Sequence, residues 1–457
     1  MPDRPVGEER DKNERDRKNV IAPRMQPLSP TRRRSSFLGT MIHFENLKWV
    51  RKGSARSLIL SLPSAAINFD TSVANPALGP EIIVMSFAKI LDNLPLQKSP
   101  LVRRFEQLIG PKSEAELESM ARTSQVLTLQ NFGRTMRLFA PLYLSNECIN
   151  NCRYCGFSRD NPILRVTLSM DEVVAEARYL SEAGFRQILL VAGEHPKFVS
   201  EDYLVECVRA LAPDFPSISI EVGPMSIQDY VPIVGAGGEG LVVYQETYQR
   251  AVYAELHTAG PKRDFDYRLN CPERAYAAGF RRIGIGALFG LWRWQEEAIA
   301  LAAHVDYLLR RCWQAQITVS LPRLRPAAGG FLPVFSISDR ELAQLVCALR
   351  ISFPQVGIVL STRERPSLRD ALVSLGVTMM SAGSHTEPGG YTRRGTEHLH
   401  QTVRGRIIPP EFQEGQDQLA TGQFEISDDR PPERIAAVLR QRGFEPVWKD
   451  WEQALSG

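Results

Sequence analysis

The sequence predicts a (β/α)8 barrel, the TIM-type fold of the α/β class. Apolar segments alternate with amphipathic segments, so that eight predicted strands and the helices between them fill about 255 residues, as in such barrels. Unusual polar residues follow the predicted strands, where the active-site loops of a barrel lie. An open doubly wound sheet is the alternative fold.

The elements of the barrel are predicted from apolar periodicity and helix-capping signals. The predicted strands are Leu138–Leu144, Gln187–Ala192, Ser217–Val222, Gly240–Tyr244, Arg282–Gly286, Ile317–Leu321, Gly357–Ser361 and Val377–Ser381. The predicted helices between them are Met170–Ala183, Glu201–Leu211, Ile227–Val234, Phe265–Ala278, Gln295–Trp313, Asp339–Ser352 and Ser367–Leu375.

Four regions follow from this assignment. Residues 1–84 hold many charges of both signs and few large apolar residues, so we expect an extension that is disordered or that begins at a non-native start. Residues 85–135 form a helical flank, with helices at Phe87–Leu94 and Glu114–Gln130. Residues 136–391 form the barrel. Residues 392–457 form a C-terminal loop, which is polar and surface-exposed over 392–429, and a helix that packs on the barrel. Trp448 and Trp451 close the chain and dock on it.

Composition excludes several classes of protein. The 457 residues are 43% hydrophobic and 23% charged, which is an ordinary soluble composition. A net charge of +3, without basic residues interleaved with aromatic ones, does not indicate a nucleic-acid partner. No apolar run approaches the roughly 18 residues that span a bilayer. We therefore expect a cytoplasmic protein that binds neither nucleic acid nor membranes.

Three of the seven cysteines, Cys148, Cys152 and Cys155, fall within eight residues after the first strand. Thiolates favour an iron-sulfur cluster, zinc or copper. Three of them can bind three irons of a [4Fe-4S] cube and leave the fourth iron open for a ligand. A zinc site completed by a distant His and a set of inert buried cysteines are the alternatives. Disulfides are disfavoured by the odd count and by the absence of a secretory signal.

Polar and glycine residues gather at the strand ends. Taken singly, each glycine fits a turn and each arginine fits a solvated surface, so their joint placement carries the argument. The segments are Gly193–His195, Glu221–Pro224, Tyr244–Tyr248, Gly284–Gly290, Ser320–Arg325, Ser361–Glu364 and Ser381–Tyr391.

The Cys-x3-Cys-x2-Cys spacing resembles that of radical S-adenosylmethionine (SAM) enzymes. Further segments make residues 86–455 similar to the 2-iminoacetate synthase family, the tyrosine lyases of thiamine thiazole biosynthesis. These are Gly193–His195, Val243–Tyr248, Arg323–Pro326, Leu360–Glu364, Pro388–Tyr391 and Pro446–Trp451. Residues 1–84 match nothing in that family.

The resemblance implies a role for each site residue. Cys148, Cys152 and Cys155 would bind the [4Fe-4S] cluster. For SAM, Gly193 and Glu194 would receive the methionine ammonium group and Arg268 its carboxylate. Ribose would contact Glu221 and Gln245. Adenine would lie near Tyr154, Gly284 and Gly286. The substrate tyrosine would bind through Ser320, Arg323, Arg325 and Arg363.

The resemblance also implies the reaction and its partners. A 5'-deoxyadenosyl radical would take hydrogen from the amino group of L-tyrosine, and Cα–Cβ cleavage would give 2-iminoacetate and p-cresol. The implied partners are thiazole synthase and a low-potential electron donor such as flavodoxin or ferredoxin. Rival interpretations are a hydrogenase-maturation tyrosine lyase, which the lack of cysteine after Cys347 disfavours, a deazaflavin-forming enzyme, and a zinc-stabilised binding protein.

Overall fold

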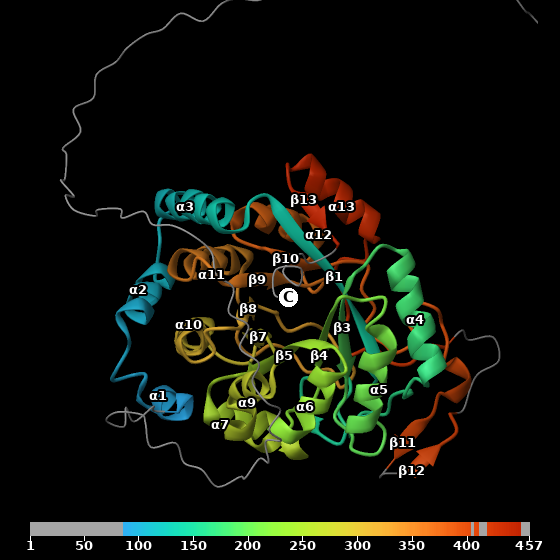
Figure 1. Ribbon diagram of the computed structural model, residues 1–457. Coiled ribbons are helices and arrows are strands. Elements are labelled where there is room, and N and C mark those ends of the chain that lie inside the picture. The colour runs from blue at the N-terminus through green and yellow to red at the C-terminus, as the bar shows by residue number, and fades with distance from the viewer. Residues whose placement is uncertain (1–85, 404–405, 411–417, 449–457) are drawn as a thin grey trace, which may run out of the picture. The chain divides into compact units, whose positions relative to one another are not determined.

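A computed structural model describes residues 86–403, 406–410 and 418–448. Eight parallel strands close into a barrel, because β1 pairs with β3 on one side and with β10 on the other (Figure 1). In order around the barrel the strands are β1 (Thr135–Ser145), β3 (Gln187–Ala192), β4 (Ser217–Glu221), β5 (Gly238–Glu246), β7 (Arg282–Ala287), β8 (Gln316–Ser320), β9 (Gly357–Leu360) and β10 (Met379–Ser381). The predicted (β/α)8 barrel is confirmed, and the open sheet is wrong.

Helices surround the barrel and cover its apolar outer face (Figure 1). Serine residues begin most of the predicted helices, and Ser169 and Ser338 form capping boxes with a glutamate three residues later. The helices between the strands are α4 (Met170–Glu182), α5 (Glu201–Leu211), α6 (Ile227–Gly235), α7 (Arg250–Leu256), α8 (Phe265–Leu269), α9 (Cys271–Ala278), α10 (Trp294–Arg311), α11 (Asp339–Ser352) and α12 (Pro366–Leu372).

Sequence reasoning missed α7 and was wrong about the segment that follows it. The segment predicted as a single helix, Phe265–Ala278, forms α8 and α9, which are separated at Asn270. Pro272 lies in the first turn of α9 and has no N–H to donate to the carbonyl group four residues earlier, so one helix cannot run through this point.

Other elements lie outside the barrel. The N-terminal flank contains the two predicted helices, α1 (Phe87–Asn93) and α3 (Glu114–Phe132), and also α2 (Pro100–Ile109), which was not predicted. Two short strands, β2 (Asn151–Cys152) and β6 (His257–Ala259), pair beside the cysteines. The remaining short elements are η1 (Pro261–Arg263), η2 (Val373–Leu375), η3 (Thr396–His398), β11 (Gln401–Val403) and β12 (Arg406–Ile408).

The C-terminal segment returns to the barrel. Residues 418–428, which we call the strap, cross the ends of the barrel strands through backbone hydrogen bonds to Leu164, Gly156, Pro326 and Thr362. The strap ends at Asp428, which is fully buried and forms an ion pair with Arg369. The prediction of a surface loop over 392–429 is therefore wrong for the strap.

The chain then packs on the outside of the barrel. Helix α13 (Pro432–Gln441) leads into β13 (Glu445–Val447), which pairs with the start of β1. The Trp448 ring packs edge-on against Phe185, with ring centroids 5.1 Å apart. This contact confirms the predicted docking of Trp448, whereas Trp451 and the extension over 1–84 lie outside the described residues. Across the described ranges, no helix combines the length and apolarity needed to cross a membrane.

Candidate active site

The cysteine loop follows β1 at the carboxyl end of the barrel, and a buried arginine holds it there. Arg165 is 1% exposed and donates hydrogen bonds to the carbonyl oxygens of Asn146, Phe157 and Ser158. Carbonyl groups of a loop buried without partners would be costly, so this guanidinium stabilises the loop conformation. The side-chain amide of Asn146 also donates to the Thr421 carbonyl oxygen, which joins the loop to the strap.

The three thiols are spaced more widely than a single metal ion requires. In the described part of the chain, the only three ligand-type side chains with donor atoms within 4.8 Å of one another are Glu172, Glu397 and His398. Thiolates around one zinc ion at 2.3 Å would lie about 3.8 Å apart. At least one pair of the three sulfur atoms is therefore more than 4.8 Å apart, wider than the spacing around one tetrahedral ion, and the all-sulfur donor chemistry suits a larger iron-sulfur cluster. This geometry counts against the zinc alternative.

Gly193, which follows β3, packs so closely against the cysteine loop that only glycine fits. A Cβ atom on Gly193 would lie 2.2 Å from the carbonyl oxygen of Glu147 and 3.2 Å from Cβ of Cys148. The next residue, Glu194, accepts a hydrogen bond of 2.6 Å from Asn150 in the same loop. Gly193 and Glu194 therefore lie directly against the cysteine loop.

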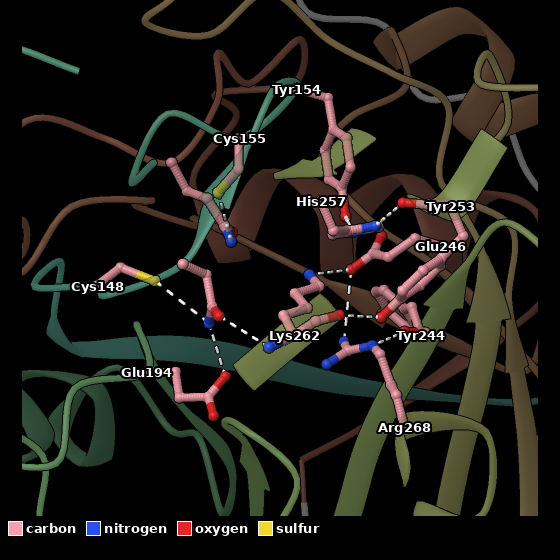
Figure 2. Close-up of polar contacts among 12 residues, drawn as sticks. Cys148, Tyr154, Cys155, Glu194, Tyr244, Glu246, Tyr253, His257, Lys262 and Arg268 are labelled. Carbon is pink, nitrogen blue, oxygen red and sulfur yellow. Dashed lines mark hydrogen bonds and ion pairs between the residues drawn. The ribbon is translucent and has the colours of Figure 1, made fainter. Parts of the chain in front are cut away.

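A buried charge network lies on the other side of the cysteines (Figure 2). Lys262 and Arg268 both point to Glu246, at 2.7 and 3.4 Å. Burial alone would raise the pKa of Glu246, but the two cations outweigh burial and lower it. Glu246 also has a φ of 70°, in the left-handed region that non-glycine residues rarely adopt. Two cations for one anion leave an excess positive charge beside the thiols.

The lumen contains a second set of polar residues. A cavity inside the strand ends is lined by Tyr143, Glu221, Tyr244, Ser320, Arg363, Ser384, Gln423 and Phe424, among others. The guanidinium of Arg363 lies 3.3 Å from the centroid of the Phe424 ring. It makes no hydrogen bond or ion pair with the residues that the structure describes. The buried hydroxyl group of Ser384 has no partner there either. These groups are available to a ligand.

The structure separates the predicted arginines. Arg323 forms an ion pair with Glu364 through two nitrogen atoms and another with Asp339, so its charge is already neutralised. Arg325 lines the cavity next to Tyr154 and Cys155, and its Nε is buried without a partner in the described ranges. Arg325 and Arg363 therefore lie at the candidate site as free cations, whereas Arg323 does not.

The other predicted residues occupy different positions. Gln245 donates to the Phe265 carbonyl oxygen at 3.4 Å, and Arg268 donates to the Tyr244 carbonyl oxygen at 2.7 Å. Gly284 and Gly286 lie within β7 rather than in the loop after it. A Cβ on Gly286 would lie 2.8 Å from the Tyr244 ring, so this glycine makes room for an aromatic side chain in the lumen.

Sequence reasoning missed five residues of the site, namely Tyr143, Glu246, Lys262, Gln423 and Phe424. Tyr143 could have been found, because alternation along β1 places it on the inner face with Phe139 and Pro141. Lys262 follows a short irregular segment, and the strap residues lie in a polar stretch without periodicity. Sequence carries no comparable signal for these.

Comparisons with known proteins agree with this geometry. Residues 142–301 match the family model "Radical SAM superfamily", and residues 320–445 match "Biotin and Thiamin Synthesis associated domain". The chain is 41% identical to 2-iminoacetate synthase of Escherichia coli strain K12 over 349 residues, which cover 76% of this chain and 86% of that protein. It also resembles the solved FeFe-hydrogenase maturase HydG from Carboxydothermus hydrogenoformans, with 36% identity, a TM-score of 0.67 and coverage of 80% of both chains.

The closed parallel barrel, with three thiols in the loop at the carboxyl end of its first strand, is that of a radical SAM enzyme. Methylornithine synthase (PylB) shares this fold, with a TM-score of 0.59 and 21% identity. Within this class, the chain belongs to the 2-iminoacetate synthase family.

Proposed function

We propose that this protein is a radical SAM lyase that cleaves the Cα–Cβ bond of L-tyrosine to 2-iminoacetate and p-cresol, releasing methionine and 5'-deoxyadenosine. The observation that supports it most directly is a lumen cavity that contains the Arg363 guanidinium, without a hydrogen bond or ion pair in the described residues, and that adjoins a second cavity lined by Cys155. Its similarity to the 2-iminoacetate synthases over most of its length supports the same reaction.

The thiols of Cys148, Cys152 and Cys155 would bind three irons of a [4Fe-4S] cluster. Burial raises the pKa of each thiol, and the charge of a bound metal would favour the thiolate form. A reduced cluster would supply the electron that cleaves SAM to methionine and a 5'-deoxyadenosyl radical. Lys262 lies among the groups that favour the charged thiolates.

SAM would lie across the strand ends that face the cysteine loop. Glu194 and the Gly193 backbone would bind the methionine ammonium group, because they lie directly against the loop. Arg268, with Lys262 beside it, would bind the carboxylate, since the pair exceeds the charge of Glu246. We retain Gln245 for ribose and Tyr154, Gly284 and Gly286 for adenine.

Tyrosine would bind in the lumen cavity that Arg363 lines. Arg363 or Arg325 would bind its carboxylate, because both guanidinium groups lack partners among the described residues. Ser320 and Ser384 would contribute hydroxyl groups. The apolar walls formed by Phe139, Leu189 and Val191 would contact the ring and exclude water, which protects a reactive radical. The closed barrel and the strap complete this enclosure.

The instability of 2-iminoacetate in water indicates a partner enzyme that receives it directly. An imine of glyoxylate hydrolyses readily in water, so direct transfer to thiazole synthase would protect it. The cluster requires a low-potential electron donor such as flavodoxin or ferredoxin. The resemblance to the family supports both partners, and the chemistry of the product supports the transfer to thiazole synthase.

One experiment tests the function. The protein would be reconstituted with iron and sulfide without oxygen, mixed with SAM, dithionite and tyrosine, and analysed for 5'-deoxyadenosine and p-cresol by chromatography. We expect both products from the wild type and neither from Cys152→Ala. Deoxyadenosine without p-cresol would retain the radical SAM class and reject tyrosine as the substrate.

A further inference from the structure

The lumen holds two unpaired groups of opposite charge, the carboxyl group of Glu221 and the guanidinium of Arg363. Both line the cavity that Tyr143, Tyr244 and Ser320 enclose. In the part of the chain that the structure describes, neither group forms a hydrogen bond or an ion pair. A charged group in a dehydrated cavity is costly unless it is paired, so the two groups favour a ligand that carries both charges.

Neighbouring carboxylates do have cationic partners. Glu246 pairs with Lys262, and Glu364 pairs with Arg323. Glu221 therefore differs from these two carboxylates at the strand ends, because it has no ion-pair partner among the described residues.

The strand places Glu221 between two cavities. On β4, Ile218 and Ile220 face the apolar core under the helices, whereas alternation turns Ser219 and Glu221 inward. Glu221 is the last residue of the strand, and it lines both the lumen cavity and the cavity that contains Cys155. It is thus adjacent to the place where the radical would form and to the place where the substrate would bind.

An α-amino acid carries the two charges that this pair complements. We propose that Glu221 binds the α-ammonium group of the substrate tyrosine and accepts one proton from it before the hydrogen atom is removed. The proton moves from the nitrogen to a carboxylate oxygen, which leaves a neutral amine and a carboxylic acid, and no electron is transferred. The inference rests on the proposed function and replaces the expected contact between Glu221 and ribose.

The surroundings of Glu221 suit this role. Burial and the charge of Glu246 raise its pKa to about 7, although nearby cations oppose the shift. A base whose pKa lies near the working pH is the most effective. The groups that face it are Tyr143 from β1, Tyr244 and Glu246 from β5, Lys262 from η1, Arg268 from α8 and Arg363 from the segment after β9.

The test compares Glu221→Gln, which keeps the shape and loses the base, with Glu221→Asp, which keeps a carboxylate. Glu239→Gln, at the start of the neighbouring strand β5 and outside both cavities, is the matched control. Reconstituted enzymes with equal iron content are assayed for p-cresol and 5'-deoxyadenosine from pH 6.5 to 9. Over this pH range the fraction of free tyrosine whose amino group is neutral rises steadily. Binding of labelled tyrosine to the unreduced, SAM-loaded enzyme is measured by equilibrium dialysis.

We expect Glu221→Gln to form p-cresol about 100-fold more slowly at pH 7, the lower range for loss of a general base. Its rate should then rise about tenfold per pH unit, because free amine from solution replaces the missing base, while the wild-type rate does not rise in this way. Glu221→Asp should recover much of the rate, tyrosine binding should weaken in Glu221→Gln, and Glu239→Gln should match the wild type.

Three results would overturn the inference. Glu221→Gln could turn over within threefold of the wild type, or it could lose SAM cleavage in the absence of tyrosine, which would assign Glu221 to the cofactor. A deficit that does not change with pH would indicate a positioning role only. If the wild type itself formed no p-cresol, the proposed function would fail and take this inference with it.

Discussion

The hydroxyl group of Tyr154 donates a hydrogen bond to Nε2 of His257, and the two atoms lie 2.7 Å apart. Nδ1 of the same ring lies 2.7 Å from the carbonyl oxygen of Tyr253, so Nδ1 carries the proton. Burial, with the nearby Lys262 cation, lowers the pKa of His257 to about 3, and the ring stays neutral. The imidazole therefore connects the cysteine loop to α7 without titrating (Figure 2).

The substitution Tyr154→Phe should destabilise the protein by about 1–3 kcal/mol, because Nε2 of His257 is left buried without a donor. Urea unfolding of the metal-free protein measures the change. Tyr276→Phe is the control, since it removes a hydrogen bond to Gln314 at the surface and should cost less than about 0.5 kcal/mol. Equal losses in the two variants would contradict the role of His257 as a buried acceptor.

The substitution Gly193→Ala should impair cluster assembly. Its Cβ would lie 2.2 Å from the Glu147 carbonyl oxygen, so the cysteine loop must move. We expect bound iron per chain to fall by at least half after reconstitution, as measured by a colorimetric iron assay. Gly235→Ala is matched to it, because a Cβ there meets no atom within 4 Å. Full iron content in Gly193→Ala would show that the loop tolerates the displacement.

The strap residue Phe424 should affect the substrate and not the cofactor. Phe424→Leu keeps an apolar side chain but removes the ring face beneath the Arg363 guanidinium. A cation–π contact contributes about 1 kcal/mol, which corresponds to about a fivefold increase in the KM for tyrosine. The rate of SAM cleavage in the absence of tyrosine, measured as 5'-deoxyadenosine formed, should not change. An unaltered KM would remove Arg363 from the tyrosine site.

Glu297 should make folding stability depend on pH. It accepts hydrogen bonds from the Thr247 hydroxyl and the Tyr248 N–H, and burial raises its pKa from 4.5 to about 7. The folded state therefore binds this proton more tightly than the unfolded state. The resulting stability is complete below about pH 4.5 and is lost as the pH rises through 7.

Comparing wild type with Glu297→Gln isolates this contribution, which amounts to up to about 3 kcal/mol. The difference in unfolding free energy between the two proteins should shift in favour of the variant as the pH rises from 5 to 8. A difference that stays constant over this range would mean that Glu297 is ionised in the folded protein throughout.

Sequence reasoning predicted the barrel well because strand and helix periodicities are local. It could not separate Arg323 from Arg363, because both follow barrel strands and only the side-chain partners distinguish them. It missed Lys262 and the strap for a related reason. Their positions depend on long-range contacts, such as the hydrogen bond between Tyr143 and Gln423, which join residues far apart in the chain.

The strap is synthesised after the cysteine loop that it contacts. The cysteine loop leaves the ribosome long before residues 418–428, yet Gly156 and Asn146 of that loop bind strap backbone in the finished fold. A nascent chain therefore presents its cysteines without their final cover. The strap, anchored by the buried Asp428–Arg369 ion pair, then covers the carboxyl end of the barrel. The proposed cluster can therefore reach these thiols before residues 418–428 dock on the barrel.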